Sequence, residues 1–134
     1  MSVRLAVVGV VVADMAVSLG FYRELGLDLP VELDGEEHVE CLLPGGLTMT
    51  WDTPGIIKAF APGWTPQGEG HSSTIGFGCD SAEEVDTLYA RIAGLGPYGF
   101  VEPWDAFWGQ RYAALHDPDR NVVDLFASLP SRDD

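Results

Sequence analysis

The sequence has few basic residues, and this shortage narrows the possible partners. Only 7 Lys and Arg residues stand against 21 Asp and Glu residues, which gives a formal net charge of −14. Such a chain repels a phosphate backbone, so we do not expect it to bind nucleic acid. An acidic surface favours solubility first, and it favours cationic small molecules over anionic ones.

Cysteines and long apolar runs are also scarce. The two cysteines, Cys41 and Cys79, lie in separate apolar stretches, and we expect both to be buried, reduced thiols in a cytoplasmic protein. No apolar segment is long enough to span a bilayer, so no membrane partner is expected. The N-terminal run MSVRLAVVGVVV is short and continues directly into Asp14, which favours a strand over a signal peptide.

The composition is otherwise that of one globular domain, because 46% of the 134 residues are apolar and 21% are charged. The elements expected in the first half are a strand at 4–12, a helix at 15–25 capped by Asp14, and strands near 27–32, 36–43 and 47–52. A Pro- and Gly-rich connection, 53–70, follows.

The second half repeats this order of elements. The elements expected there are a strand at 71–79, a helix at 82–93 capped by Ser81, and strands near 98–103, 108–116 and 121–127. The repeat aligns Gly9 with Gly76 and Tyr22 with Tyr89. It predicts two βαβββ modules, about 1–52 and 71–128, within a single α+β domain, 1–134.

Alternation along the strands separates an apolar face from a mixed face. The apolar face, expected beneath the helices, contains Val8, Val10, Val12, Val39, Cys41, Leu43, Leu47, Met49, Trp51, Ile75, Phe77, Cys79, Val123 and Leu125. The mixed face contains Val7, Gly9, Val11, His38, Glu40, Thr48, Thr50, Asp52, Thr74, Gly76, Gly78, Val122, Asp124 and Phe126. A mixed face is either solvated or lines a cavity, and its glycines leave room for another group.

Three segments together resemble the vicinal oxygen chelate superfamily, which includes glyoxalases, bleomycin resistance proteins and dioxygenases. These segments are ADMAVSLGFYRELGL (13–27), SAEEVDTLYARI (81–92) and WGQRYAALHDPDRNVVDLFA (108–127). The resemblance implies a cupped mixed sheet around a cavity, with the helices on its convex face. It also implies a homodimer.

Enzymes of that family hold a divalent metal through one residue from the first strand and one from the last strand of each module. The corresponding residues here are Val7, Thr50, Thr74 and Asp124. Valine cannot coordinate a metal and threonine is a poor neutral ligand, so we expect no metal and no other cofactor. A rearranged site at His38 and Glu40 is an alternative, although such a pair is more often a surface ion pair.

The remaining function implied by the resemblance is that of the metal-free branch, which sequesters antibiotics and other flat aromatic compounds. We expect a binding protein of this kind, with no catalytic residue assigned. The alternative is an enzyme of the same fold. Such an enzyme is either glyoxalase- or dioxygenase-like, with unusual metal ligands, or a metal-free lyase or isomerase that uses His38, Glu40 or Asp124 as acid or base. A third possibility is an interaction module whose aromatic residues serve only the dimer.

Aromatic residues suited to stacking are present. Trp51 is expected in the core, Trp64 lies in the connection, and Trp104 and Trp108 are expected in a loop at the strand ends. These loop tryptophans are covered by a ligand, by the dimer partner or by simple packing. Asp124 is either a solvated residue or a carboxylate that contacts a ligand. The expected ligand-binding residues are Trp64, Trp104, Trp108, His38, Glu40, Thr50, Asp124 and Phe126, together with Tyr112 and His116, which the resemblance places on the cavity face.

Overall fold

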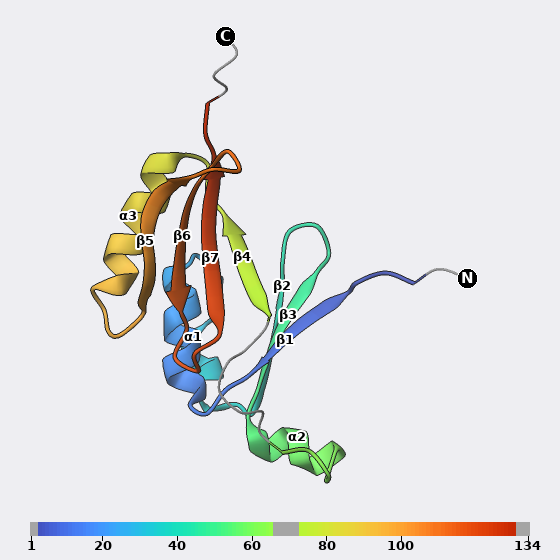
Figure 1. The fold of residues 1–134 in the computed structure, drawn as a ribbon. Coiled ribbons are helices and arrows are strands. Elements are labelled where there is room, and N and C mark those ends of the chain that lie inside the picture. The colour runs from blue at the N-terminus through green and yellow to red at the C-terminus, as the bar shows by residue number, and fades with distance from the viewer. Residues whose placement is uncertain (1–2, 66–72, 131–134) are drawn as a thin grey trace. The chain divides into compact units, whose positions relative to one another are not determined.

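The structure is a computed structural model that describes residues 3–65 and 73–130 (Figure 1). The chain divides into two compact units, Met1–Gly68 and Glu69–Asp134, each built on its own sheet. The division lies inside the connection expected at 53–70. Within the described residues, seven strands and three α-helices are formed, as expected for an α+β fold.

The first unit contains a three-stranded mixed sheet. Its elements are β1 (Val7–Val11), α1 (Met15–Glu24), the 3-10 helix η1 (Val31–Gly35), β2 (His38–Leu42), β3 (Thr48–Asp52) and α2 (Pro54–Phe60). The strand order is β1-β3-β2, with β1 parallel to β3 and β2 antiparallel to it. Asp14 caps α1 by accepting a hydrogen bond from the Val17 amide at 3.2 Å.

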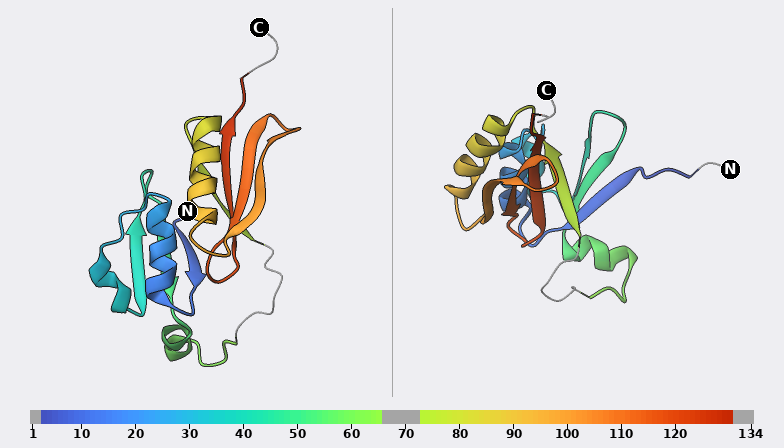
Figure 2. Two further views of the ribbon diagram at one scale, coloured as in Figure 1. Left: turned by 90° about the vertical axis from the view of Figure 1, so that its left-hand side faces the viewer. Right: turned by 45° about the horizontal axis from the view of Figure 1, so that its top comes forward.

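The second unit contains a four-stranded mixed sheet with one helix against it (Figure 2). Its elements are β4 (Thr74–Gly78), α3 (Ala82–Ala93), β5 (Gly99–Ala106), β6 (Gln110–His116) and β7 (Val122–Ser128). The strand order is β4-β7-β6-β5, and only the β4–β7 pairing is parallel. This unit has the complete βαβββ order expected from the sequence.

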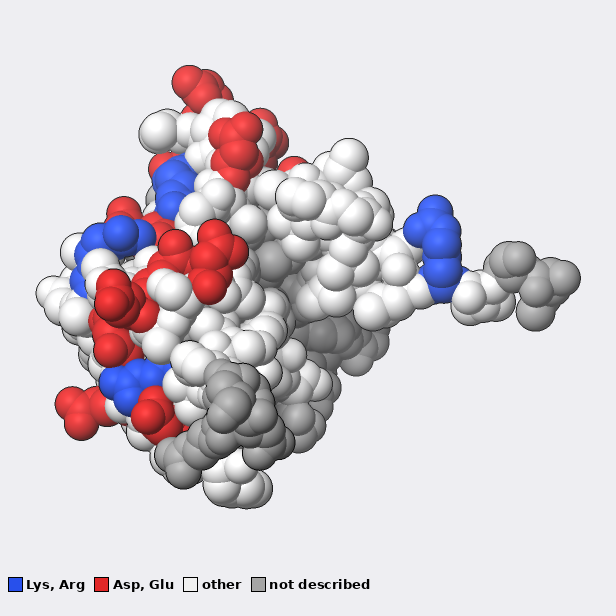
Figure 3. All heavy atoms as spheres, turned by 90° about the horizontal axis from the view of Figure 1, so that it is seen from above, with Lys and Arg blue, Asp and Glu red and all other residues white. Residues whose placement is uncertain are grey.

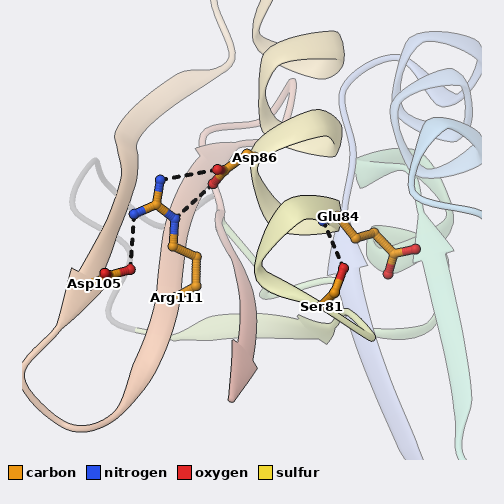
Figure 4. A network of polar contacts seen from close by, with 5 residues as sticks. All are labelled: Ser81, Glu84, Asp86, Asp105 and Arg111. Atoms are coloured by element: carbon orange, nitrogen blue, oxygen red, sulfur yellow. Dashed lines mark hydrogen bonds and ion pairs between the residues drawn. The ribbon is translucent and has the colours of Figure 1, made fainter. Parts of the chain in front are cut away.

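Charged contacts, as well as packing, hold α3 against the sheet of the second unit (Figure 4). Arg111 on β6 donates to both carboxylate oxygens of Asp86 on α3, at 2.8 and 3.2 Å, and to Asp105 on β5 at 3.0 Å. Ser81 caps α3 by accepting from the Glu84 amide at 3.1 Å. Arg111 therefore lies on the helix side of the sheet.

The alternation predicted from the sequence is confirmed in both sheets. In the first unit Tyr22 of α1 contacts Trp51 with ring centroids 5.5 Å apart, and both side chains are fully buried. In the second unit Val85 and Ile92 of α3 are buried, as are Val123 and Leu125 of β7. The face of each sheet that points away from its helix is called the open face below.

Two segments of the first unit differ from expectation. The strand expected near 27–32 is wrong: Leu29 and Pro30 precede η1, and their carbonyl groups accept from the Arg23 guanidinium instead of joining a ladder. Arg23 also pairs with Asp34 at 2.5 Å, which holds η1 beside the end of α1. The connection contains a helix, α2, because Thr53 accepts from the Ile56 amide and Pro54 stands at the first helical position.

A buried aspartate organises the turn between β6 and β7. Asp117 is 1% exposed, and its carboxylate accepts from the amides of Asp119 and Asn121 and from the Asn121 side chain, at 2.8–2.9 Å. Arg120 in this turn has a φ of 71°, a left-handed conformation that is costly for most residues. The DPDRN segment is therefore a structural turn that sets the start of β7.

Candidate functional site

One rung of the second sheet brings three aromatic positions together. Trp104 on β5 is paired with Tyr112 on β6, Tyr112 with Phe126 on β7, and Phe126 with Gly78 on β4. Paired residues on neighbouring strands point to the same face, so these rings lie side by side on the open face. Trp104 was expected in a loop, and it belongs to β5 instead.

Trp108 extends this rung from the turn that joins β5 to β6. Its ring centroid lies 5.6 Å from that of Trp104 and 5.5 Å from that of Tyr112, in edge-to-face arrangements. Its Nε1–H donates to Gln110 at 2.8 Å, which fixes the orientation of the indole. Trp104 and Trp108 remain 40% and 48% exposed. These two exposed tryptophans, with the partly buried Tyr112 and Phe126, form what we call the aromatic cluster: Trp104, Trp108, Tyr112 and Phe126.

The glycines of β4 are explained by Phe126. A Cβ atom at Gly76 would lie 3.2 Å from the Phe126 ring, and one at Gly78 would lie 3.5 Å from it. The ring therefore lies against the bare backbone of β4, and the room that these glycines leave is used in part by Phe126. This packing holds Phe126 in place at one end of the aromatic cluster.

Asp124 lies on the open face, one alternate position along β7 from Phe126. The Tyr112 hydroxyl donates to its Oδ1 at 2.7 Å. Burial, and then this hydrogen bond and the adjacent negative charge, raise the pKa of Tyr112 to about 12. The phenol therefore stays neutral at physiological pH, and the pair presents one carboxylate beside the aromatic cluster.

His116, also on β6, stacks with Phe100 of β5, which is not part of the aromatic cluster. The two ring centroids lie 4.2 Å apart, with the planes 27° from parallel. Burial, followed by the positive charge of Arg120, lowers the pKa of His116 below its usual value. Phe100 was missed because β5 shifts register between Gly99 and Val101 and again before Trp104, so alternation fails there.

The first unit carries a polar cluster on its open face. His38 Nδ1 contacts Asp52 on β3, and its Nε2 contacts Glu40 at 2.8 Å. These two hydrogen bonds, with Glu40 the larger contribution, raise the pKa of His38 above its usual value. Thr50 lies on the same face and is only 8% exposed. Asp52 was placed on this face from the sequence but was not selected as a site residue.

Trp64 is not one of the residues that these ladders bring together. It follows α2 in the first unit, where its amide donates to the Ala61 carbonyl at 2.9 Å. Both cysteines are free and half-buried, and burial is the main cause that raises the pKa of each thiol. None of the helices in the described ranges is both long and apolar enough to cross a membrane.

Comparison with known proteins places the chain in a family. Residues 4–125 match the sequence model of the Glyoxalase/Bleomycin resistance protein/Dioxygenase superfamily. The chain belongs to this superfamily. The segments that suggested the vicinal oxygen chelate family from the sequence therefore identified it correctly. No curated relative matches the sequence.

Solved structures of this superfamily have the same fold. A family enzyme from Burkholderia phytofirmans PsJN is 19% identical, with 95% of this chain and 100% of that chain covered and a TM-score of 0.79. A glyoxalase-related enzyme from Fulvimarina pelagi is 18% identical over 93% and 88%, with a TM-score of 0.78. A glyoxalase/bleomycin resistance protein from Albidiferax ferrireducens T118 is 26% identical over 91% and 96%, with a TM-score of 0.64.

The metal positions of the superfamily do not fit a metal in this chain. Val7 has no donor atom, and the Thr50 hydroxyl fills the space above Gly9, where a Cβ atom would lie 2.5 Å from it. Thr74 supplies one neutral hydroxyl, and Asp124 already accepts from Tyr112. Within residues 3–65 and 73–130, no group of three or more His, Cys, Asp or Glu side chains is arranged to hold a metal ion.

Proposed function

We propose that this superfamily member captures an aromatic or polycyclic small molecule, without a metal, on the open face of its second unit. The observation that carries the proposal is the aromatic cluster, in which two half-exposed tryptophans are held in fixed orientations beside Tyr112 and Phe126. Exposed, ordered rings provide stacking surfaces at the centroid spacings that aromatic ligands prefer. Binding would release water from these rings without first reorganising them.

Sequestration of an antibiotic is the biological use that we propose for this capture. The mechanism is stoichiometric: the ligand stacks on Trp108 and Trp104 while polar groups such as Tyr112 and Asp124 orient it. Bond making and breaking are not required, which agrees with the poor fit of the family metal positions. The proposed location is the cytoplasm, where the two free cysteines would remain reduced.

Intrinsic tryptophan fluorescence tests this proposal. The purified protein is titrated with bleomycin, mitomycin and an anthraquinone-type polycycle, and the ligand is recovered and analysed afterwards. Saturable quenching at a fixed stoichiometry, with the compound recovered unchanged, supports capture. Chemical conversion of the compound, or the absence of any response across the panel, contradicts it.

We also propose that the protein is a homodimer. β1 is an edge strand of the described first sheet, and the apolar side chains of Val3, Leu5 and Val7 on and before it are 84%, 76% and 54% exposed. Exposed apolar side chains along a strand edge favour pairing with another chain. Light scattering after size exclusion should give twice the monomer mass for the wild type, and Leu5→Asp should shift it toward the monomer.

A second candidate function, general acid–base catalysis, is supported by the polar cluster of the first unit. His38 lies between Asp52 and Glu40, and both contacts favour its protonated form. A positioned imidazolium can donate a proton to a substrate. Turnover of a glutathione hemithioacetal that is lost in His38→Gln, and kept after chelation, would favour this candidate over capture.

A further inference from the structure

The carboxylate beside the aromatic cluster points to the charge of the ligand. Resting on the proposed function, we propose that the site selects planar aromatic ligands that carry a positive charge, with Asp124 as their counter-ion. A protonated ring nitrogen or amine attached to a fused ring system is the chemical class that fits. Three features support this choice.

The first feature is the position of Asp124 in the sheet. Its paired neighbours on the open face are Ala114 on β6 and Gly76 on β4, which are too small to cover the carboxylate. Phe126 lies two residues along the same strand, at a spacing of about 7 Å for alternate strand residues. A ligand with its rings on the aromatic cluster can therefore place a nitrogen at the edge of its ring system over Asp124.

The second feature is that the charge of Asp124 is not neutralised. Its partner Tyr112 is a neutral phenol that occupies Oδ1 and leaves Oδ2 free to accept from a ligand N–H. Arg111, next to Tyr112 on β6, is turned to the helix side, where it pairs with Asp86 and Asp105. Among the ion pairs formed by residues 73–130 in the structure, none includes Asp124.

The third feature is that the surroundings strengthen attraction to a cation. A flat ligand that covers Asp124 excludes water and lowers the local dielectric constant, which increases the Coulomb energy of the pair. The faces of the exposed tryptophans also attract cations. Acidic side chains are exposed on the face of the molecule drawn in Figure 3. The overall charge of −14 adds a long-range attraction for cations.

A pair of fluorescent probes with the same three-ring outline tests this proposal. 9-Aminoacridine is cationic at pH 7.5, whereas acridone is neutral at that pH. The affinity of each probe is measured by fluorescence anisotropy for the wild type and for Asp124→Asn, Trp108→Ala and Glu83→Gln. Asp124→Asn keeps an acceptor for the Tyr112 hydroxyl but removes the charge. Glu83→Gln removes one negative charge from an exposed position of α3 and is the matched control.

We expect the wild type to bind 9-aminoacridine at least tenfold more tightly than acridone. Asp124→Asn should remove that preference by weakening the binding of the cationic probe alone. Glu83→Gln should leave the preference unchanged. Trp108→Ala should weaken the binding of both probes. Equal wild-type affinities, or an equal loss for both probes in Asp124→Asn, would overturn cation selection while leaving aromatic capture intact. Failure of the wild type to bind either probe would overturn the capture proposal together with this inference.

Discussion

The open face of β1–β3 carries small, aliphatic and polar side chains, whereas the open face of β4–β7 carries the aromatic cluster. The two sheets have the same parallel pairing of first and last strand, Gly9 opposite Thr50 in one and Gly76 opposite Asp124 in the other. In the first sheet, Gly9 leaves room for the Thr50 hydroxyl. In the second sheet, Gly76 leaves room for the ring of Phe126. A repeated backbone thus supports two different surfaces, and the aromatic one is better suited to a flat ligand.

The largest effect on stability is expected at the turn of the second unit. Asp117→Ala removes a buried carboxylate that accepts three hydrogen bonds, and leaves their donors without that acceptor. The free energy of unfolding should fall by about 2–3 kcal/mol, measured by urea denaturation. In the first unit the corresponding β2–β3 turn uses glycines, and Gly45, with a φ of +95°, is the matched position. Gly45→Ala should cost about 1 kcal/mol, and an equal loss in the two variants would contradict the distinction.

A second prediction tests which unit binds the ligand, by comparing the affinity lost when a tryptophan of each unit is replaced. Trp108→Ala should weaken binding of an aromatic ligand by about 1.5 kcal/mol, or roughly tenfold, because a stacking face is lost. Trp64→Ala, in the first unit, should leave affinity nearly unchanged. Isothermal titration calorimetry of both variants gives the comparison. A larger loss for Trp64→Ala would move the site to the first unit.

The helix caps allow a like-for-like comparison of the two units. Asp14 caps α1 and Ser81 caps α3, each through one hydrogen bond to an amide three residues later. Asp14→Ala and Ser81→Ala should each lower the free energy of unfolding by about 1 kcal/mol. Thermal unfolding followed by circular dichroism checks both values. A loss in one variant only would show that one helix does not depend on its cap.

The smallest effect is an opposite pH response of two histidines. The folded pKa of His38 is raised above the unfolded value, so its contribution to stability is complete below about 6.5 and is lost as pH rises through the folded pKa. The folded pKa of His116 is lowered, so its contribution is complete above about 6.5 and is lost as pH falls through the folded pKa. NMR titration of the imidazole signals, assigned with His38→Gln and His116→Gln, should place His38 above His116. The reverse order would contradict the contacts of His38 with Glu40 and Asp52.

Alternation was enough to predict which strand residues face the helix and to place Asp124 and Phe126 on the other side. It did not reveal that Asp52 contacts His38 or that Tyr112 binds Asp124, because such contacts depend on strand register. Trp104 was assigned to a loop because Pro103 and the register shifts of β5 hide its strand pattern. The strand expected near 27–32 failed for another reason. Its carbonyl groups are held by Arg23, a contact that local propensity does not encode.

The most direct test of the central claim is to see which indole groups sense a bound ligand. ¹⁵N-labelled protein is titrated with 9-aminoacridine, and the four tryptophan Nε1–H signals are assigned by single Trp→Phe variants. We predict that the signals of Trp104 and Trp108 shift in a saturable manner, while those of Trp51 and Trp64 do not. Saturable shifts confined to Trp51 or Trp64, with Trp104 and Trp108 unmoved, would contradict the assignment of the ligand site to the second unit.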